Sequence, residues 1–313
     1  DILTHGDPVA VHGYTSAQGD ASVRVAVADY INANFSVGIG ADNIYMTCAA
    51  AASLCINLNA LLNEGDEVIT IAPYFPEYKV FTAHARGKLV PVQGSEGTFQ
   101  PDIAAIKGAI TPHTKAVLIN SPNNPSGVVY TEESIKQLCK VLQECKDNGQ
   151  TIYLISDEPY RELVFGRVKV PYIMNYYADS IVCYSFSKSL SLPGERIGYI
   201  AVNPAICNDG EVYAAICGAG RALGYVCAPS LFQLIIPRVI GKTSDISVYE
   251  RNRDVLSAAL QCYGYEVVKP DGAFYLFVKS LLPDSDSFAE RAKEHELLIV
   301  SAKSFGVEGY VRI

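Results

Sequence analysis

A lysine inside a run of small hydroxyl residues is the first feature of the sequence that could do chemistry. Lys188 lies in Tyr184–Ser191, directly after an apolar run, and Arg196 follows eight positions later. Desolvation and a nearby cation would lower the pKa of the amine from about 10.4 and favour the neutral nucleophile that forms an imine. Ser185, Ser187 and Arg196 can supply hydrogen-bond donors and positive charge for a phosphate. The plain alternative is a polar loop between strands, since most lysines are solvated surface charges.

An acid and a tyrosine follow a second apolar run. Asp157 comes directly after Ile152–Ser156, and Tyr160 follows three residues later. A carboxylate in this place can accept a hydrogen bond from a protonated ring nitrogen, and a phenol can donate to an oxygen of the same ligand. The alternative is that Asp157 is a capping acid and Tyr160 lies at the rim of the sheet.

An asparagine-rich turn follows a third apolar run. Ala116–Asn120 leads into Ser121–Gly127, whose residue types a turn alone would explain. The segment also places Asn124 just after a strand, where its side-chain amide could bind a ligand oxygen. All three polar clusters therefore follow predicted strands.

These clusters belong to an alternation of strand-like apolar runs with longer helix-like runs. Continuous apolar runs suit strands that are covered on both faces, as in a parallel sheet. Thr131, followed by two acids, predicts a helix that runs to about Lys146 and stops at Asn148–Gly149. The alternation predicts an α/β domain whose ligands bind at the carboxyl ends of the strands. We expect strands at 68–71, 116–120, 152–156, 181–184 and 198–202, and helices at 18–35, 50–63, 131–146 and 206–222.

After about residue 240 the pattern changes to α+β. We therefore expect a large domain at 13–240 and a smaller domain made of 1–12 and 241–313. Only a few residues separate Asp7–Pro8 from Gly13–Tyr14, and the chain stops inside a strand-like run, so we expect segments to be missing at both places. In the smaller domain we expect helices at about 245–263 and 285–296 and strands at 265–268, 274–278 and 298–300.

The composition excludes several classes of protein. The chain has 313 residues, of which 49% are hydrophobic and 19% charged, as in a globular protein with a large core. A net charge of −8 argues against broad binding to nucleic acid or to an anionic membrane. No apolar run approaches the ~20 residues of a membrane helix, and we expect no signal peptide. The nine cysteines and five histidines show no metal-ligand spacing, so we expect no metal and buried, reduced thiols in a cytoplasmic protein.

Together the three clusters resemble the aspartate aminotransferase-like family of fold-type I enzymes, which depend on pyridoxal 5'-phosphate (PLP). The family pattern is Asn-Pro-x-Gly, then Asp-x-x-Tyr, then Ser-x-x-Lys with a downstream arginine. Here it stands as Asn124–Gly127, Asp157–Tyr160 and Ser185–Lys188 with Arg196. Their ordered co-occurrence is specific, and the resemblance extends across nearly the whole chain. It implies a mostly parallel sheet sandwiched by helices in a large domain, plus a smaller α+β domain.

The resemblance implies a role for each of these residues. Lys188 would hold PLP as a Schiff base and move the substrate's α-proton. Asp157 would keep the pyridine nitrogen protonated, while Tyr160 and Asn124 would bind the ring oxygen. The phosphate would be bound by Ser185, Ser187 and Arg196.

Met46–Ala52 resembles the turn whose backbone N–H groups bind the phosphate at a helix N-terminus. The family usually has glycine where Ala49 or Ala50 stands, and alanine fits if its φ is negative. We expect Ala50 and Ala51 to bind the phosphate. The plain alternative, an alanine-rich core helix, is compatible with that role.

Four further positions are implied by resemblance. In Ala72–Tyr78 the ring that stacks on the pyridine would be Phe75, with Tyr74 as the alternative. Tyr14 would reach the phosphate of the neighbouring subunit, which implies a homodimer. Arg312 would grip the substrate's α-carboxylate as a bidentate fork, and Gly6 would lie on the segment that closes over the substrate.

The implied activity is a PLP-dependent aminotransferase that moves an amino group between an L-amino acid and a 2-oxo acid by a ping-pong mechanism. One alternative is a lyase of the same fold, such as a cysteine-S-conjugate β-lyase, which no residue here separates from a transferase. The other is a non-catalytic, aminotransferase-like sensor domain, which predicts a basic DNA-binding segment upstream.

Overall fold

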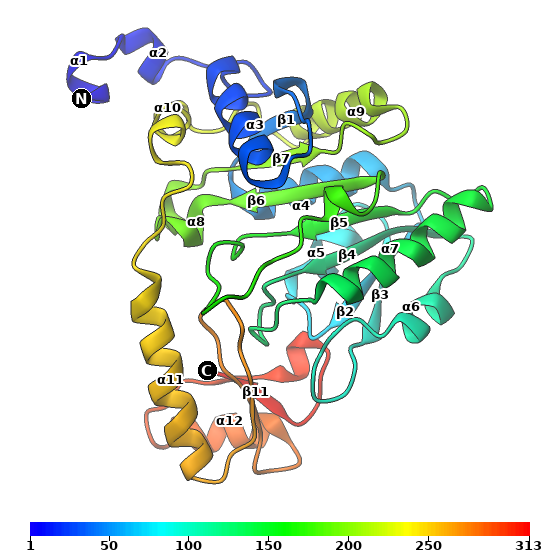
Figure 1. Cartoon of the computed structure of the whole chain (residues 1–313), viewed down its shortest axis with the longest axis vertical. Coiled ribbons are helices and arrows are strands. Elements are labelled where there is room, and N and C mark those ends of the chain that lie inside the picture. Colours follow the sequence, from blue (N-terminus) through cyan, green and yellow to red (C-terminus); the bar gives the residue numbers. More distant parts are fainter.

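The large part of the molecule is built on a seven-stranded sheet (Figure 1). The computed structural model describes all of residues 1–313. The sheet order is β1-β7-β6-β5-β4-β2-β3, in which β2 to β6 run parallel and β7 runs antiparallel to both β6 and β1. The strands are β1 Ile44–Thr47, β2 Glu67–Ala72, β3 Lys88–Gln93, β4 Thr114–Asn120, β5 Tyr153–Asp157, β6 Ser180–Ser185 and β7 Gly198–Val202.

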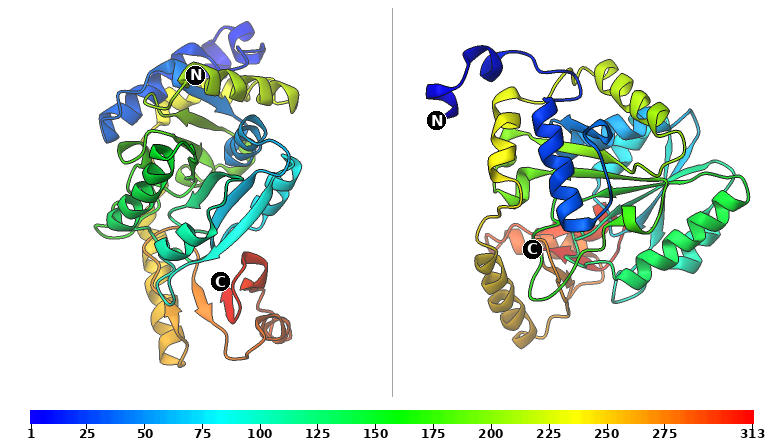
Figure 2. Two further views of the ribbon diagram at one scale, coloured as in Figure 1. Left: turned by 90° about the vertical axis from the view of Figure 1, so that its right-hand side faces the viewer. Right: turned by 45° about the horizontal axis from the view of Figure 1, so that its top comes forward.

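Helices flank this sheet on both faces (Figures 1 and 2). Nearly every residue of the central strands is buried, because side chains on each face pack against helices. The mostly parallel α/β sheet that the sequence predicts is therefore confirmed. The helices of this part are α3 Ala21–Phe35, α4 Ala49–Leu61, α5 Glu77–His84, α6 Ile103–Ala109, α7 Glu132–Asp147, α8 Phe186–Ser189, α9 Asp209–Ala222 and α10 Ser230–Val239.

A four-stranded antiparallel sheet lies below the large one in Figure 1. Its order is β10-β11-β9-β8, so strands distant in sequence pair side by side. The predicted strand at 274–278 is displaced, since β9 begins only at Phe277. The elements are α11 Ile246–Cys262, β8 Val267–Val268, β9 Phe277–Lys279, α12 Ser285–Lys293, β10 Val300–Ser301 and β11 Tyr310–Arg312.

Local sequence signals account for where several helices begin. Thr131 caps α7 as predicted, because its hydroxyl accepts the backbone N–H of Ser134 at 3.1 Å. Asp20 and Asp245 cap α3 and α11 in the same way. Strands β1 and β3 were not predicted: β1 has only four residues, and β3 is partly exposed and contains Pro91.

The N-terminal residues form α1 Ile2–His5 and α2 Pro8–His12, which lie beside α10 (Figure 1). Their contacts are therefore to the large part of the molecule. The assignment of residues 1–12 to the smaller domain stays a prediction without a contact to support it.

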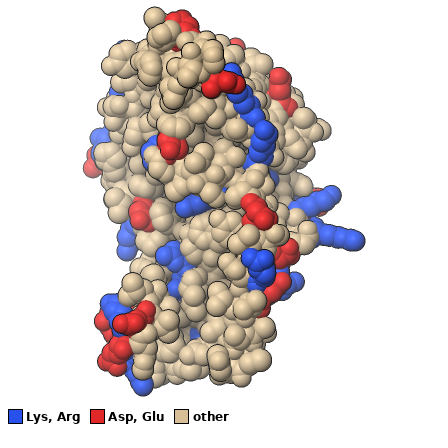
Figure 3. All heavy atoms as spheres, turned by 90° about the vertical axis from the view of Figure 1, so that its left-hand side faces the viewer, with Lys and Arg blue, Asp and Glu red and all other residues tan.

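The surface and the thiols add two observations. Acidic and basic side chains are interspersed over the face in Figure 3, with no large area of one sign. All nine cysteines are free, but the expectation that they are buried holds fully only for Cys139 and Cys183, since Cys207 and Cys262 are exposed. No helix combines the length and the apolar character that crossing a membrane requires.

Candidate active site

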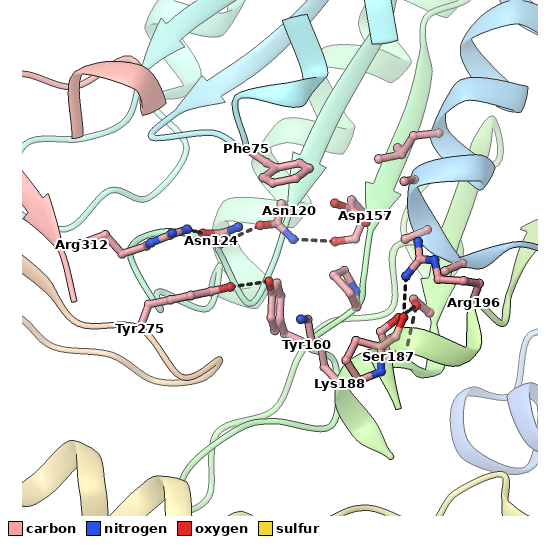
Figure 4. Close-up of a pocket in the computed structure, with 17 residues that line it drawn as sticks. Phe75, Asn120, Asn124, Asp157, Tyr160, Ser187, Lys188, Arg196, Tyr275 and Arg312 are labelled. Atoms are coloured by element: carbon pink, nitrogen blue, oxygen red, sulfur yellow. Dashed lines mark hydrogen bonds between the residues drawn. The ribbon is translucent and has the colours of Figure 1, made fainter. Parts of the chain in front are cut away.

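A cavity of about 270 Å³ lies where the carboxyl ends of the parallel strands meet the smaller sheet (Figure 4). The strands β4, β5 and β6 end there at Asn120, Asp157 and Ser185. Because all three strands run parallel, the residues after them reach one edge of the sheet. The cavity is lined by the predicted residues Phe75, Ala50, Ala51, Asn124, Asp157, Tyr160, Ser185, Ser187, Lys188, Arg196 and Arg312.

The lysine is held on a short helix directly after β6. Ser185 ends the strand and caps α8, because its hydroxyl accepts the backbone N–H of Ser187 at 3.2 Å. Lys188 follows on this turn, with its Nζ 5.4 Å from the centre of the Phe274 ring. Burial, reinforced by the positive charge of Arg196, lowers the pKa of the Lys188 amine. Both causes favour the neutral nucleophile, as the sequence analysis anticipated.

Hydrogen-bond donors gather at one end of the cavity. Helix α4 begins at Ala49, and no side chain caps it. The N–H groups of its first turn therefore have no side-chain acceptor. Ser185 and Ser187 bond each other through their hydroxyls at 2.7 Å, and the Arg196 guanidinium lies beside them (Figure 4). The expectation of a negative φ fails at one position, because Ala49 adopts φ 69°. This end therefore has the donors and the charge that a phosphate requires.

Asp157 lines the same cavity with a buried carboxyl group. Its Oδ2 accepts a hydrogen bond from the Tyr78 hydroxyl at 2.7 Å, while Oδ1 has no partner in the chain. Burial raises the pKa of Asp157 to about 7; the Tyr78 hydrogen bond lowers it and the charge of Glu158 raises it further. A buried acceptor without a partner is costly. Its place on the cavity wall therefore suits a ligand that brings a donor, such as a protonated ring nitrogen.

Two asparagines connect the backbone of Asp157 to the arginine of the smaller sheet. Asn120 donates to the backbone oxygen of Asp157 at 2.8 Å and accepts from the backbone N–H of Asn124 at 2.7 Å. The Arg312 guanidinium donates to the side-chain oxygen of Asn124 at 2.9 Å (Figure 4). One chain of hydrogen bonds thus runs from β5 to β11.

A tyrosine that the sequence analysis did not select completes the wall. Tyr275 and Tyr160 share a hydrogen bond between their hydroxyls at 3.0 Å, and the Arg312 guanidinium lies 4.7 Å from the centre of the Tyr275 ring. Burial, and next the neighbouring Tyr275, raises the pKa of Tyr160 well above its usual value. Tyr275 was read as part of a strand, and only its place beside Arg312 in space reveals it. Asn120 was also missed, although it is the polar residue that ends the apolar run 116–120; the structure aligns it with Asp157 on the neighbouring strand.

Three predicted positions lie outside the cavity wall. Gly6 borders another hollow beside Leu234 and Arg238, so the structure does not bring it to Lys188. Tyr14 is 91% exposed and borders a separate hollow beside Cys48, not the cavity that contains Lys188. Phe75 lines the cavity, whereas Tyr74 packs against the segment that contains Gly306.

Comparisons with known proteins point in one direction. The family model described as aminotransferase class I and II matches residues 2–313. A crystal structure of an amino transferase from Eubacterium rectale is 54% identical, with a TM-score of 0.98, over 100% of this chain and 79% of that chain. The Thermus thermophilus aspartate aminotransferase with maleate is 27% identical, with a TM-score of 0.88, over 100% of this chain and 80% of that one. A probable aspartate/prephenate aminotransferase of Aquifex aeolicus is 31% identical over 96% of this chain and 78% of that protein.

Proposed function

Because this chain belongs to the class I and II aminotransferase family, we propose that the cavity between its two sheets is the site where an amino group moves between an L-amino acid and a 2-oxo acid. The chain is a PLP-dependent aminotransferase, and its relatives do not favour the lyase or the sensor-domain alternative. The observation that carries the assignment of the site is the convergence of Lys188, Asp157 and Arg312 on one cavity.

The side chains around the cavity fit PLP. The first turn of α4, the Ser185–Ser187 pair and Arg196 would hold its phosphate. The partnerless Oδ1 of Asp157 would accept a hydrogen bond from its protonated ring nitrogen. Phe75 would cover the ring, with the hydroxyl of Tyr160 and the amide of Asn124 at its oxygen.

When bound, PLP supplies the electron sink for removal of the substrate's α-proton. Lys188 is the base that we assign to this step. Its amine has a pKa lowered first by burial and then by Arg196, so Nζ can accept the proton and later return it. Burial raises the pKa of Asp157 to about 7, so a protonated ring nitrogen at its free Oδ1 would stabilise the ionised carboxylate and be stabilised by it.

Arg312 orients the substrate. A planar guanidinium can bind a carboxylate through two parallel N–H groups, which fixes the direction of the α-carbon. Its contacts with Asn124 and with the Tyr275 ring hold the guanidinium in place before a substrate arrives. Such preorganisation reduces the entropy lost on binding.

The partner and the donor are further parts of the proposal. We assign the exposed Tyr14 to the phosphate site of a neighbouring subunit in a homodimer, which its exposure on the single chain allows. Aspartate is the first amino donor to test, because aspartate aminotransferases from several organisms are among the relatives.

A visible absorption spectrum of the purified protein with PLP tests the function directly. We expect a band of lysine-bound cofactor that disappears on adding an accepted amino acid and returns with a 2-oxo acid. Lys188→Ala should lack the band, while Lys269→Ala, a change at an exposed lysine, should keep it. Release of pyruvate and ammonia from a cysteine conjugate without a 2-oxo acid would contradict transamination. A band that persists in Lys188→Ala would remove Lys188 from its role.

A further inference from the structure

Tyr78 is the side chain behind the cavity wall that contacts two cofactor-facing residues at once. It lies in the first turn of α5, three residues after Phe75, and is fully buried. It does not line the cavity itself. Any effect of Tyr78 on the chemistry therefore has to pass through the residues that it touches.

Both contacts of Tyr78 have defined geometry. Its hydroxyl donates to Oδ2 of Asp157 at 2.7 Å, which leaves Oδ1 of that carboxyl free for a ligand. Its ring meets the Phe75 ring edge to face, with centroids 5.7 Å apart and planes at 80°. The edge-to-face arrangement is a favoured geometry for aromatic pairs.

We propose that Tyr78 is a positioning residue that fixes both the carboxylate facing the cofactor's ring nitrogen and the ring that covers the cofactor. The proposal rests on the function assigned above. The hydroxyl would keep the proton on the ring nitrogen by stabilising the ionised Asp157, and the aromatic ring would hold the tilt of Phe75.

The surroundings of Asp157 make the ionisation of its carboxyl depend on the Tyr78 hydroxyl. Burial and the charge of Glu158 both raise the pKa of the carboxyl, and the Tyr78 hydrogen bond is the named interaction that lowers it. Glu158 is itself paired with the buried Arg161 and accepts a hydrogen bond from Ser156. The remaining titratable groups that face Asp157 are Tyr160 on the next loop and Cys183 on β6. Neither donates a hydrogen bond to the carboxylate.

Removal of the Tyr78 hydroxyl therefore changes the position of the proton between Asp157 and the ring nitrogen. Without Tyr78 the buried carboxylate is less stable, so the proton shared with the ring nitrogen shifts towards Asp157. A hydrogen bond to a charged group is worth enough to shift such an equilibrium about tenfold or more. The nitrogen becomes less protonated while the total number of protons is unchanged.

The test is the ¹⁵N chemical shift of the ring nitrogen in PLP labelled at that atom and bound to the protein. We expect the shift of a protonated nitrogen in the wild type and a displacement towards the neutral value in Tyr78→Phe. Tyr130→Phe is the matched control, because Tyr130 is a buried tyrosine with no hydrogen bond to Asp157. Tyr78→Leu removes the ring as well and should also change the circular dichroism of the cofactor band, which Tyr78→Phe should keep.

An unchanged nitrogen shift in Tyr78→Phe, or an equal displacement in Tyr130→Phe, would overturn the proposal. If Tyr78→Leu fails to fold, the comparison of the two phenylalanine variants still decides it. Failure of the proposed function would look different, because the wild type itself would then bind no cofactor, or would release pyruvate and ammonia from a cysteine conjugate without a 2-oxo acid.

Discussion

The guanidinium of Arg312 on β11 donates a hydrogen bond of 2.9 Å to the side-chain oxygen of Asn124, which follows β4. Arg312 belongs to the smaller sheet and Asn124 to the turn after a strand of the larger one, so this bond joins the two parts of the molecule at the candidate site. The Tyr275 and Phe305 rings lie 4.7 and 4.9 Å from the same guanidinium. Arg312 is therefore held in a fixed direction, with its other N–H groups free for a carboxylate.

Arg312→Lys should weaken substrate binding while leaving the cofactor bound. An ammonium cannot form two parallel bonds to a carboxylate, so we expect KM for the amino acid to rise about tenfold to a hundredfold. The affinity for PLP should change by less than about threefold, a difference of well under 1 kcal/mol. Steady-state kinetics and a cofactor titration check both. Arg167→Lys, on an exposed loop, is the control. Equal losses of cofactor and substrate affinity would place Arg312 elsewhere in the mechanism.

Arg196→Gln should raise the pKa of Lys188, because the cation of Arg196 is one of the two causes that lower it. Burial remains, so the pKa should stay below that of an ordinary lysine. The measurement is the pH dependence of reductive methylation of Lys188 in the cofactor-free protein, followed by mass spectrometry. The reaction should begin at higher pH in the variant. Superimposable pH curves for the variant and the wild type would show that the two charges do not interact.

Asp157→Asn should flatten the pH dependence of stability in the cofactor-free protein. The pKa of Asp157 rises from 3.8 to about 7 on folding, so the folded state binds this proton more tightly than the unfolded state. The free energy of unfolding of the wild type should therefore fall as pH rises from about 4 to about 7, by at most about 4 kcal/mol from this group. Urea unfolding across this range checks the slope. Asp147→Asn, at an exposed position, should keep the wild-type slope. If Asp157→Asn also keeps the wild-type slope, the raised pKa of Asp157 is refuted.

Gly198→Ala should disturb the phosphate end of the site. A Cβ at this position would lie 2.2 Å from the backbone oxygen of Tyr184 and 2.9 Å from Cα of Ala49, so β7 or the turn has to move. We expect a loss of about 1–3 kcal/mol in stability and weaker PLP binding. Gly218→Ala in α9 meets no atom within 4 Å and should stabilise the helix slightly. Thermal unfolding and PLP titration measure both variants, and a Gly198→Ala protein as stable as Gly218→Ala would contradict the argument.

The sequence predicts the larger sheet well for a physical reason. Strands buried on both faces have continuous apolar sequences, so the polar residues that follow them are easily recognised. Asp157, Lys188 and Asn124 were found in this way, and the structure brings all three to one cavity. The α7 cap at Thr131 was equally visible, since it depends on neighbouring residues alone.

The parts that could not be predicted depend on contacts between distant segments. Tyr275 looked like a strand residue, and only the approach of β9 and β11 to the large sheet brings it next to Tyr160. The positive φ of Ala49 has no signal in an alanine-rich run, because it follows from how the chain passes from β1 into α4. Tyr78 ends the segment Ala72–Tyr78, but its role was not predicted, since that role depends on a contact with Asp157 across the fold.

The place of β1 in the sheet has a consequence for biosynthesis. This strand lies at the edge of the sheet, and its single neighbour is β7. Ile44 therefore cannot form its strand pair until Ala201 has been synthesised. At usual rates of translation, on the order of ten seconds separate the synthesis of the two strands. The turn that opens α4 is anchored by β1, so a nascent chain that has not yet reached β7 has no completed anion site. The anion site is thus completed only after β7, the last strand of the larger sheet in sequence, has been synthesised.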